Sequence, residues 1–248
     1  QPTDDGYKVA FSVDVNGNDI YTSDMTAEQR YEAALQAALG YFEAAGYTVT
    51  DGKLTAAPEG AKLEYEIQIP ASGAGDHPSF MMISEASKAL ATIGMNLIVT
   101  DLSDSSGLWE DIDARQVDMW CAAWGATIDP DMYQIYYSDV ANHTTDLGTG
   151  KNPYGGPLQG GSNKMYCIAD AELDDLIMAA RESLDQSYRK TMYKACLDIV
   201  VDWAVEVPVY QRQNAVIFST ERVNMSTVTP DITPFYKWHS EIEKVELN

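Results

Sequence analysis

The sequence predicts an α/β fold in which parallel strands are joined by helices. A strand-like segment at 62–69 is followed by a helical pattern at 78–94, which runs directly into a continuous apolar segment at 95–100. A second, shorter helical pattern at 108–114 leads to another apolar segment at 117–124. Short connections in the order strand, helix, strand, helix, strand are typical of a sheet built from crossover connections.

A helix and a hairpin are predicted to precede this sheet. Thr26 begins the segment T-A-E-Q, which has the form of a capping box at a helix start. Apolar residues then recur at spacings of three and four until Gly46, a natural helix stop; they are Tyr31, Leu35, Leu39 and Phe42. Asp51 and Gly52 stand between β-prone residues and predict a tight hairpin turn.

The two strand-like segments differ in their burial pattern. Residues 62–69 alternate strictly between polar and apolar, which predicts a strand with one buried face. The apolar members are Leu63, Tyr65, Ile67 and Ile69. Residues 95–100 are continuously apolar, which is more typical of a buried strand.

The second half of the chain is predicted to contain a loop, two helices and a strand. Residues 138–165 include six glycines and show no usable periodicity, and a loop of that length is usually functional or disordered. One helix is expected to open at Asp170 and another to run from Asp185 to about Trp203. Residues 205–218 return to strand character.

Composition limits the classes of function. Hydrophobic residues make up 45% of the 248 residues, enough for a core of ordinary size. The chain has 16 Lys and Arg against 38 Asp and Glu, a formal net charge of −22. Because such a surface repels phosphate backbones and anionic headgroups, nucleic acid and membrane-surface partners are not predicted.

Cysteine count and the start of the chain bear on the compartment. Cys121, Cys167 and Cys196 are odd in number and include no C-x-x-C pair, so neither a disulfide framework nor a zinc knuckle is indicated. No apolar run approaches the ~18 residues of a membrane-spanning helix. Since the chain begins with Gln1 and shows no signal-peptide pattern, we expect a processed protein or a segment of a longer one.

Common catalytic and cofactor motifs fail at identifiable positions. The segment G-T-G-K-N lacks the hydroxyl residue that a phosphate-binding loop requires after Lys151. His77, His143 and His239 are far apart in the sequence, and none lies in an H-E-x-x-H motif. We therefore predict no cofactor and no metal site.

Asp129 and Asp131 flank a proline and allow two interpretations. They could serve as acid and base in a carbohydrate-active enzyme, which needs two carboxyls across a sugar ring. They could instead cap a following helix, because aspartate accepts hydrogen bonds from free amides and favours the positive helix end. The sequence favours the cap, and the enzyme stays open as the alternative.

Residues 117–138, V-D-M-W-C-A-A-W-G-A-T-I-D-P-D-M-Y-Q-I-Y-Y-S, resemble the signature segment of the family 5 extracellular solute-binding proteins. These are the peptide, dipeptide and nickel receptors of ABC importers. Segments 31–54, 86–112 and 163–210 are similar to further family motifs, in the same order and spacing. Together the four segments extend over about residues 27–218.

The resemblance implies a periplasmic-binding-protein-like type II lobe, with a mixed sheet flanked by helices. It also implies a truncated chain, because family members are longer and carry a signal peptide and often a lipid-anchored cysteine. Residues 1–222 would form the C-terminal ligand-binding lobe, and residues 223–248 a tail that returns to a missing first lobe. The ligand cleft would lie between the two lobes.

The resemblance also places one ligand-binding position. In peptide receptors of the family, an aspartate three positions after the tryptophan receives the ligand's N-terminal ammonium; counted from Trp124, that position is Thr127. A hydroxyl can accept a hydrogen bond but supplies no charge. Because the chain is one residue shorter before the Asp-Pro, Asp129 could take this role instead.

The remaining candidate residues suit a cleft without catalysis. Trp124 would form an apolar wall, and Gly125 would let the backbone approach the ligand. Tyr133 and Asn163 would offer polar contacts. For Trp120, Tyr136 and Tyr137 we expect packing roles.

The function that these inferences favour is that of a non-enzymatic solute receptor of a bacterial ABC importer, with a short peptide as the preferred solute. Its partners would be the solute, a membrane permease and the missing N-terminal lobe. It would act in the periplasm or, as a lipoprotein, at the extracellular face of the cytoplasmic membrane. An oligosaccharide receptor, a carbohydrate-active enzyme using Asp129 and Asp131, and a cell-surface interaction module stay open as alternatives.

Overall fold

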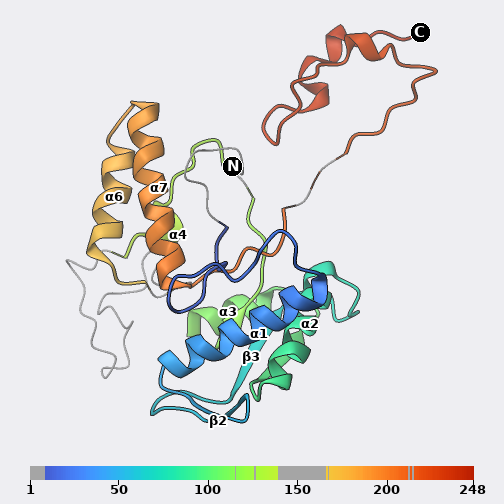
Figure 1. The fold of residues 1–248 in the computed structure, drawn as a ribbon. Coiled ribbons are helices and arrows are strands. Elements are labelled where there is room, and N and C mark those ends of the chain that lie inside the picture. The colour runs from blue at the N-terminus through green and yellow to red at the C-terminus, as the bar shows by residue number, and fades with distance from the viewer. Residues whose placement is uncertain are drawn as a thin grey trace. The chain divides into compact units, whose positions relative to one another are not determined.

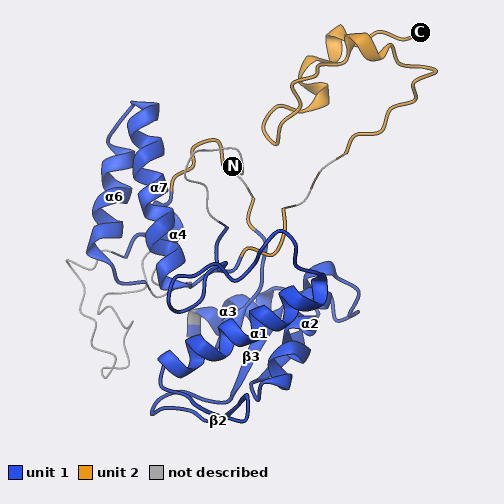
Figure 2. Cartoon of the chain, viewed as in Figure 1, with its two compact units in different colours: residues 1–123, 132–207 blue, residues 124–131, 208–248 orange. Residues whose placement is uncertain are grey.

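A computed structural model describes residues 9–114, 116–125, 127–138, 166, 168–211, 213 and 215–248 (Figure 1). The chain divides into two compact units (Figure 2). We call Gln1–Ala123 with Met132–Val207 the first unit, and Trp124–Asp131 with Pro208–Asn248 the second unit.

The first unit is built on a parallel three-stranded sheet. Its order is β4 (Asn96–Asp101), β3 (Glu64–Ile69), β5 (Met119–Trp120), with β3 in the centre. Helix α2 (Pro78–Thr92) connects β3 to β4, and α3 (Ser106–Ala114) connects β4 to β5. The predicted α/β order of strand, helix, strand, helix, strand is therefore confirmed.

One face of this sheet is buried, as the alternation in β3 predicts. Ile69, Ala71 and Ile83 form a cluster between β3 and α2, joined by Ile67 and Val99. Fully burying an isoleucine side chain such as that of Ile69 or Ile83 is worth roughly 1.5–3 kcal/mol. This cluster fixes which face of β3 turns inward.

The opposite face of the sheet is covered by α3 toward the carboxyl ends of the strands. There Gln68 Nε2 donates to Asp111 Oδ2 at 2.9 Å, and Trp109 packs edge-on against Trp120. Ile98 in β4 is 43% exposed, so the expectation that 95–100 is buried throughout is wrong at this position. A helix of nine residues is only about 14 Å long and leaves part of the face open.

Helix α1 (Ala27–Ala44) and the hairpin of β1 (Thr48–Thr50) and β2 (Lys53–Ala56) follow local sequence signals. The side chain of Thr26 accepts from Gln29 N and the side chain of Gln29 accepts from Thr26 N, which confirms the capping box. Asp51 and Gly52 have φ values of 51° and 73°, the positive pair that a tight antiparallel hairpin requires.

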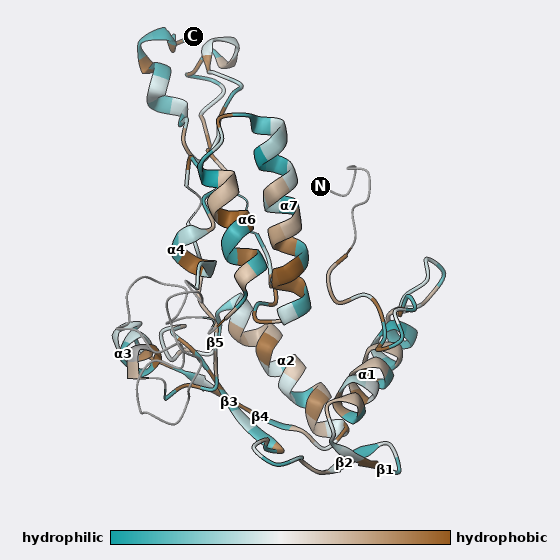
Figure 3. Cartoon of the chain, turned by 90° about the vertical axis from the view of Figure 1, so that its left-hand side faces the viewer, coloured by the Kyte–Doolittle hydropathy of each residue, from teal (hydrophilic) through white to brown (hydrophobic). Residues whose placement is uncertain are grey.

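The helices α6 (Ala171–Arg181) and α7 (Gln186–Trp203) pack side by side (Figure 3). Asp170 and Asp185 cap them, as predicted. Their shared core contains fully or nearly buried residues, namely Ile168, Leu173, Ile177, Cys196 and Val200. The short helix α4 (Tyr133–Tyr136) packs against this core.

Three local predictions are wrong. The strand expected at 117–124 is limited to β5, so Trp124 lies outside it. The N-cap position of α4 is occupied by Met132, and not by Asp129 or Asp131. The described residues of 205–218 form no strand, because β-prone sequence becomes a strand only beside a pairing partner.

The second unit contains two short 3-10 helices, η3 (Met225–Thr227) and η4 (Trp238–Lys244). An isolated bridge pairs Val223 with Leu247, and Asn248 N donates to Arg222 O at 3.0 Å. Across all described residues of the chain, no helix has the length and apolar character needed to cross a membrane.

Candidate functional site

The carboxyl edge of the parallel sheet is where open α/β sheets place ligands. After β3 the chain enters loop 70–77, and the side chain of Asp101, at the end of β4, holds this loop. Asp101 Oδ1 accepts from Ala71 N at 3.0 Å and Oδ2 accepts from Gly75 N at 3.2 Å. The edge is therefore a fixed surface made from the ends of two strands.

Cys121 follows β5 at the same edge. Its backbone N–H donates to Gln68 O at 2.9 Å, and its side chain packs on the cluster of Ile69 and Ile83. Burial raises the pKa of the Cys121 thiol. A thiol that stays protonated is a poor nucleophile, so this position favours packing over covalent chemistry.

Trp120 lies in a column of aromatic rings. Trp109 meets it at 5.9 Å between centroids, and Tyr166 stacks on it at 5.9 Å and 20°. Tyr136 stacks on Tyr166 at 5.4 Å and 7°, and its hydroxyl donates to Glu206 Oε2 at 2.5 Å. Burial, and then this hydrogen bond, raise the pKa of Tyr136. The column gives Trp120 and Tyr136 the packing roles predicted for them.

The predicted ligand residues Trp124, Gly125, Thr127 and Asp129 lie together in the second unit, all of them exposed. Trp124 is 49% exposed. The hydroxyl of Thr127 donates to the backbone carbonyl of Asp129 at 2.6 Å. Because the hydroxyl proton is used in this turn, Thr127 Oγ1 presents acceptor lone pairs, the role that an ammonium group would need.

Gly125 has open space beside it. A Cβ added there would meet no described atom within 4 Å. Packing within the described part of the chain therefore does not require glycine at this position. The close approach of a ligand to Gly125 stays a prediction.

Tyr133 belongs to the first unit, whereas the other four residues belong to the second unit. Its ring stacks on Tyr137 at 4.5 Å and 20°, and the Arg181 guanidinium carbon lies 4.1 Å from the ring centroid. The ring thus anchors α4 to α6. Asn163 and nearly all of the glycine-rich segment 138–165 lie outside the described residues.

Two features escaped the sequence-based reasoning. Asp174 is buried and binds Ser138 with both carboxylate oxygens, at 2.6 Å to N and 2.9 Å to Oγ. Its signal was an aspartate on the apolar face of α6, beside Leu173 and Ile177.

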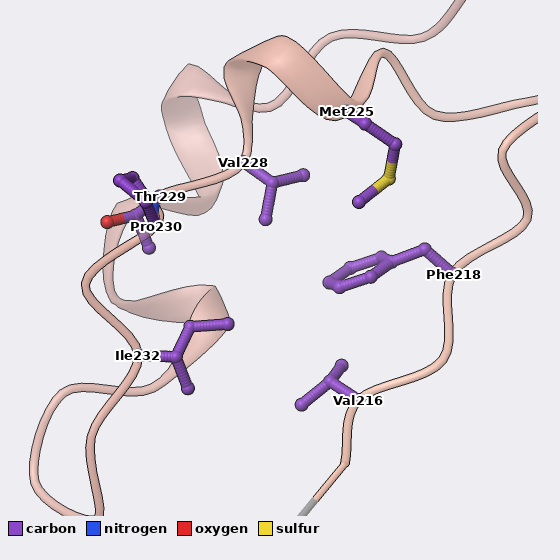
Figure 4. A pocket seen from close by; sticks show the side chains of 7 residues that line it. All are labelled: Val216, Phe218, Met225, Val228, Thr229, Pro230 and Ile232. Carbon is purple, nitrogen blue, oxygen red and sulfur yellow. The ribbon is translucent and has the colours of Figure 1, made fainter.

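The second is a pocket of about 490 Å³ in the second unit (Figure 4). The side chains of Phe218, Met225 and Val228 line it from segments that have no periodicity, so no sequence pattern pointed to it. Val216, Thr229, Pro230 and Ile232 complete its lining.

Comparison with known proteins gives a match in fold. No family model and no curated protein sequence matches the chain. Among solved structures, the oligopeptide-binding protein from Thermus thermophilus, complexed with a pentapeptide, matches 78% of this chain and 31% of its own, with a TM-score of 0.51 and 17% identity.

Two further structures are similar at lower TM-scores. The oligopeptide-binding protein AppA from Bacillus subtilis, in complex with a nonapeptide, matches 75% of this chain and 33% of its own (TM-score 0.48, 17% identity). NikZ from Campylobacter jejuni, in complex with Ni(L-His), matches 71% and 30% (TM-score 0.47, 20% identity). The chain spans about a third of the length of these structures. Its α/β fold is that of periplasmic-binding-protein-like structures.

Proposed function

We propose that this chain is one lobe of the substrate-binding component of an ABC importer, which captures an extracellular solute, preferentially a short peptide. The observation that carries the proposal is the shared fold over 78% of the chain with a protein that binds an oligopeptide. The signature-like segment at 117–138 supports it. In this proposal the protein is a receptor and performs no catalysis.

The proposal includes the organisation of the longer protein. Residues 1–222 form the C-terminal lobe, and residues 223–248 return to a first lobe on the other side of the cleft. The complete protein works outside the cytoplasmic membrane, in the periplasm or as a lipoprotein. Its two lobes close around the solute, and the closed form docks on the membrane permease because binding shifts an equilibrium between open and closed states.

The proposed site uses side chains that leave the ligand chemically unchanged. Trp124 forms an apolar wall, Gly125 allows close backbone approach, and Thr127 accepts from the peptide's ammonium group, with Asp129 beside it. Tyr133 acts through its hydroxyl, since neighbours hold its ring. Asn163 supplies a further polar contact.

Thermal unfolding of the complete protein tests this function. A pentapeptide present at 100 times its dissociation constant should stabilise the folded state by about 2.7 kcal/mol, because it binds that state alone. An oligosaccharide at the same concentration serves as the control, and product analysis checks for turnover. Hydrolysis that disappears in Asp129→Asn or Asp131→Asn would establish the enzyme instead and contradict the proposal.

Substituting Thr127 with aspartate should increase the affinity for peptides with a free N-terminus. The carboxylate adds a charge-assisted hydrogen bond to the ammonium group, so we expect about a tenfold lower dissociation constant by calorimetric titration. Thr127→Asn introduces a side chain with the shape of aspartate but without its charge, so this variant should show no such gain. An N-acetylated peptide should bind both variants alike, and a gain for that peptide would argue against this role.

A further inference from the structure

An open acidic surface lies on the parallel sheet, at the amino-terminal half of the face that carries α3. We call Glu64, Glu66, Asn96, Ile98 and Asp118 the acidic sheet face. A hollow of about 650 Å³ lies over these residues. It is at the opposite end of the strands from the carboxyl edge. Lys62 also lines the hollow, and its Nζ pairs with Asp118 Oδ1 at 3.2 Å, so the carboxylates that carry the net negative charge of this face are those of Glu64 and Glu66.

Parallel sheets are normally covered on both faces. Here α3 contacts this face only toward the carboxyl ends of the strands, at Gln68 and Trp120. In β4, Leu97 points to the other face and is buried, whereas Ile98 on this face is 43% exposed. Ile98 pairs with Glu66 in the strand register, so it presents apolar surface beside that carboxylate.

The strands fix the orientation of two carboxylates on this face. Asn96 Nδ2 donates to Glu64 Oε2 at 2.6 Å, and Thr100 Oγ1 donates to Glu66 Oε1 at 2.5 Å. Each hydrogen bond is donated by a residue of the neighbouring strand β4 to one oxygen of the carboxylate. The carboxylates are therefore held on a rigid element, with oriented charge around Ile98.

We propose that the acidic sheet face binds a basic segment of a partner protein, in which arginine or lysine side chains flank an apolar side chain that covers Ile98. Charge complementarity carries the choice of occupant, because oriented carboxylates bind guanidinium and ammonium groups through charge-assisted hydrogen bonds. The proposal is independent of the solute-binding function.

Other occupants fit less well. Within the described residues, no group of three or more acidic, histidine or cysteine side chains could hold a metal ion. A second copy of this chain would bring another net charge of −22 to an acidic face, which is repulsive.

The test uses a defined probe, the N-acetylated and C-amidated pentapeptide Arg-Gly-Ile-Gly-Arg. In an extended conformation its two arginines and its isoleucine lie on one side. Titration of the ¹⁵N-labelled chain at low ionic strength should shift the backbone signals of 64–66 and 96–100. The same peptide with glutamate in place of arginine should cause no shift there.

The double variant Glu64→Gln, Glu66→Gln should weaken probe binding by about tenfold or more, because it removes two charges while keeping one acceptor oxygen on each side chain. Glu32→Gln, Glu43→Gln removes the same charge from α1 and should leave the dissociation constant unchanged. Ile98→Ser should weaken binding several-fold and serves as an independent variant if the first unfolds. Equal weakening by both double variants, or no shift at the face, would overturn the proposal.

Discussion

Replacing Gly94 with alanine is expected to lower the free energy of unfolding by about 3 kcal/mol or more. Gly94 follows α2 with φ at 89°, a conformation that costs a side-chain-bearing residue roughly 1–2 kcal/mol. A Cβ there would also lie 2.6 Å from Leu54 O and 3.1 Å from Leu54 N. The hydrogen bond from Leu54 N to Ile93 O, 2.8 Å long, holds β2 in this place, so the backbone cannot easily withdraw.

Urea unfolding of Gly94→Ala and of Gly52→Ala separates the cost of the positive φ from the cost of the steric clash with Leu54. Gly52 also has a positive φ, 73°, but a Cβ there would meet nothing within 4 Å. Gly52→Ala should therefore show the conformational cost alone, roughly 1–2 kcal/mol. If Gly94→Ala were no worse than Gly52→Ala, the close approach of β2 to the end of α2 would be incorrect.

Replacing Asp174 with alanine is expected to destabilise the α6–α7 part of the first unit by about 3 kcal/mol. Its carboxylate accepts from the N–H and the hydroxyl of Ser138, which is fully buried. Truncation removes both of these acceptors from the buried N–H and hydroxyl groups of Ser138. A charged acceptor contributes more than a neutral one, so the loss should exceed that of an ordinary hydrogen bond.

Asp175→Ala is the matched control for this experiment, because Asp175 is the next residue of α6 and is exposed. It should change the stability by no more than about 0.5 kcal/mol. Hydrogen exchange gives a local measurement: the Ser138 amide should lose protection in Asp174→Ala and keep it in Asp175→Ala. Equal exchange in the two variants would contradict the anchoring role of Asp174.

The elements that the sequence predicted well depend on neighbours along the chain. The capping box at Thr26 and the caps at Asp170 and Asp185 join groups a few residues apart. The turn at Asp51 and Gly52 likewise depends on their own backbone conformation. For the same reason the order of strands and helices, and with it the α/β fold, could be predicted.

The candidate site was less accessible to such reasoning. The sequence placed Thr127 at the position three residues after Trp124, but it could not show that the Thr127 hydroxyl donates to the Asp129 carbonyl. Nor could the sequence reveal the contacts of the Tyr133 ring. Its contact with Arg181 joins two different helices, and its stacking on Tyr137 depends on the geometry of α4.

The sequence by itself determined the helix starts, the hairpin turn and the inward face of β3, because the forces behind them act within a few residues. Only the tertiary structure decided where β5 ends, that Ile98 is exposed and that Asp174 is buried against Ser138. Pairing and burial depend on which distant segments meet. A pattern of neighbouring residues does not contain that information.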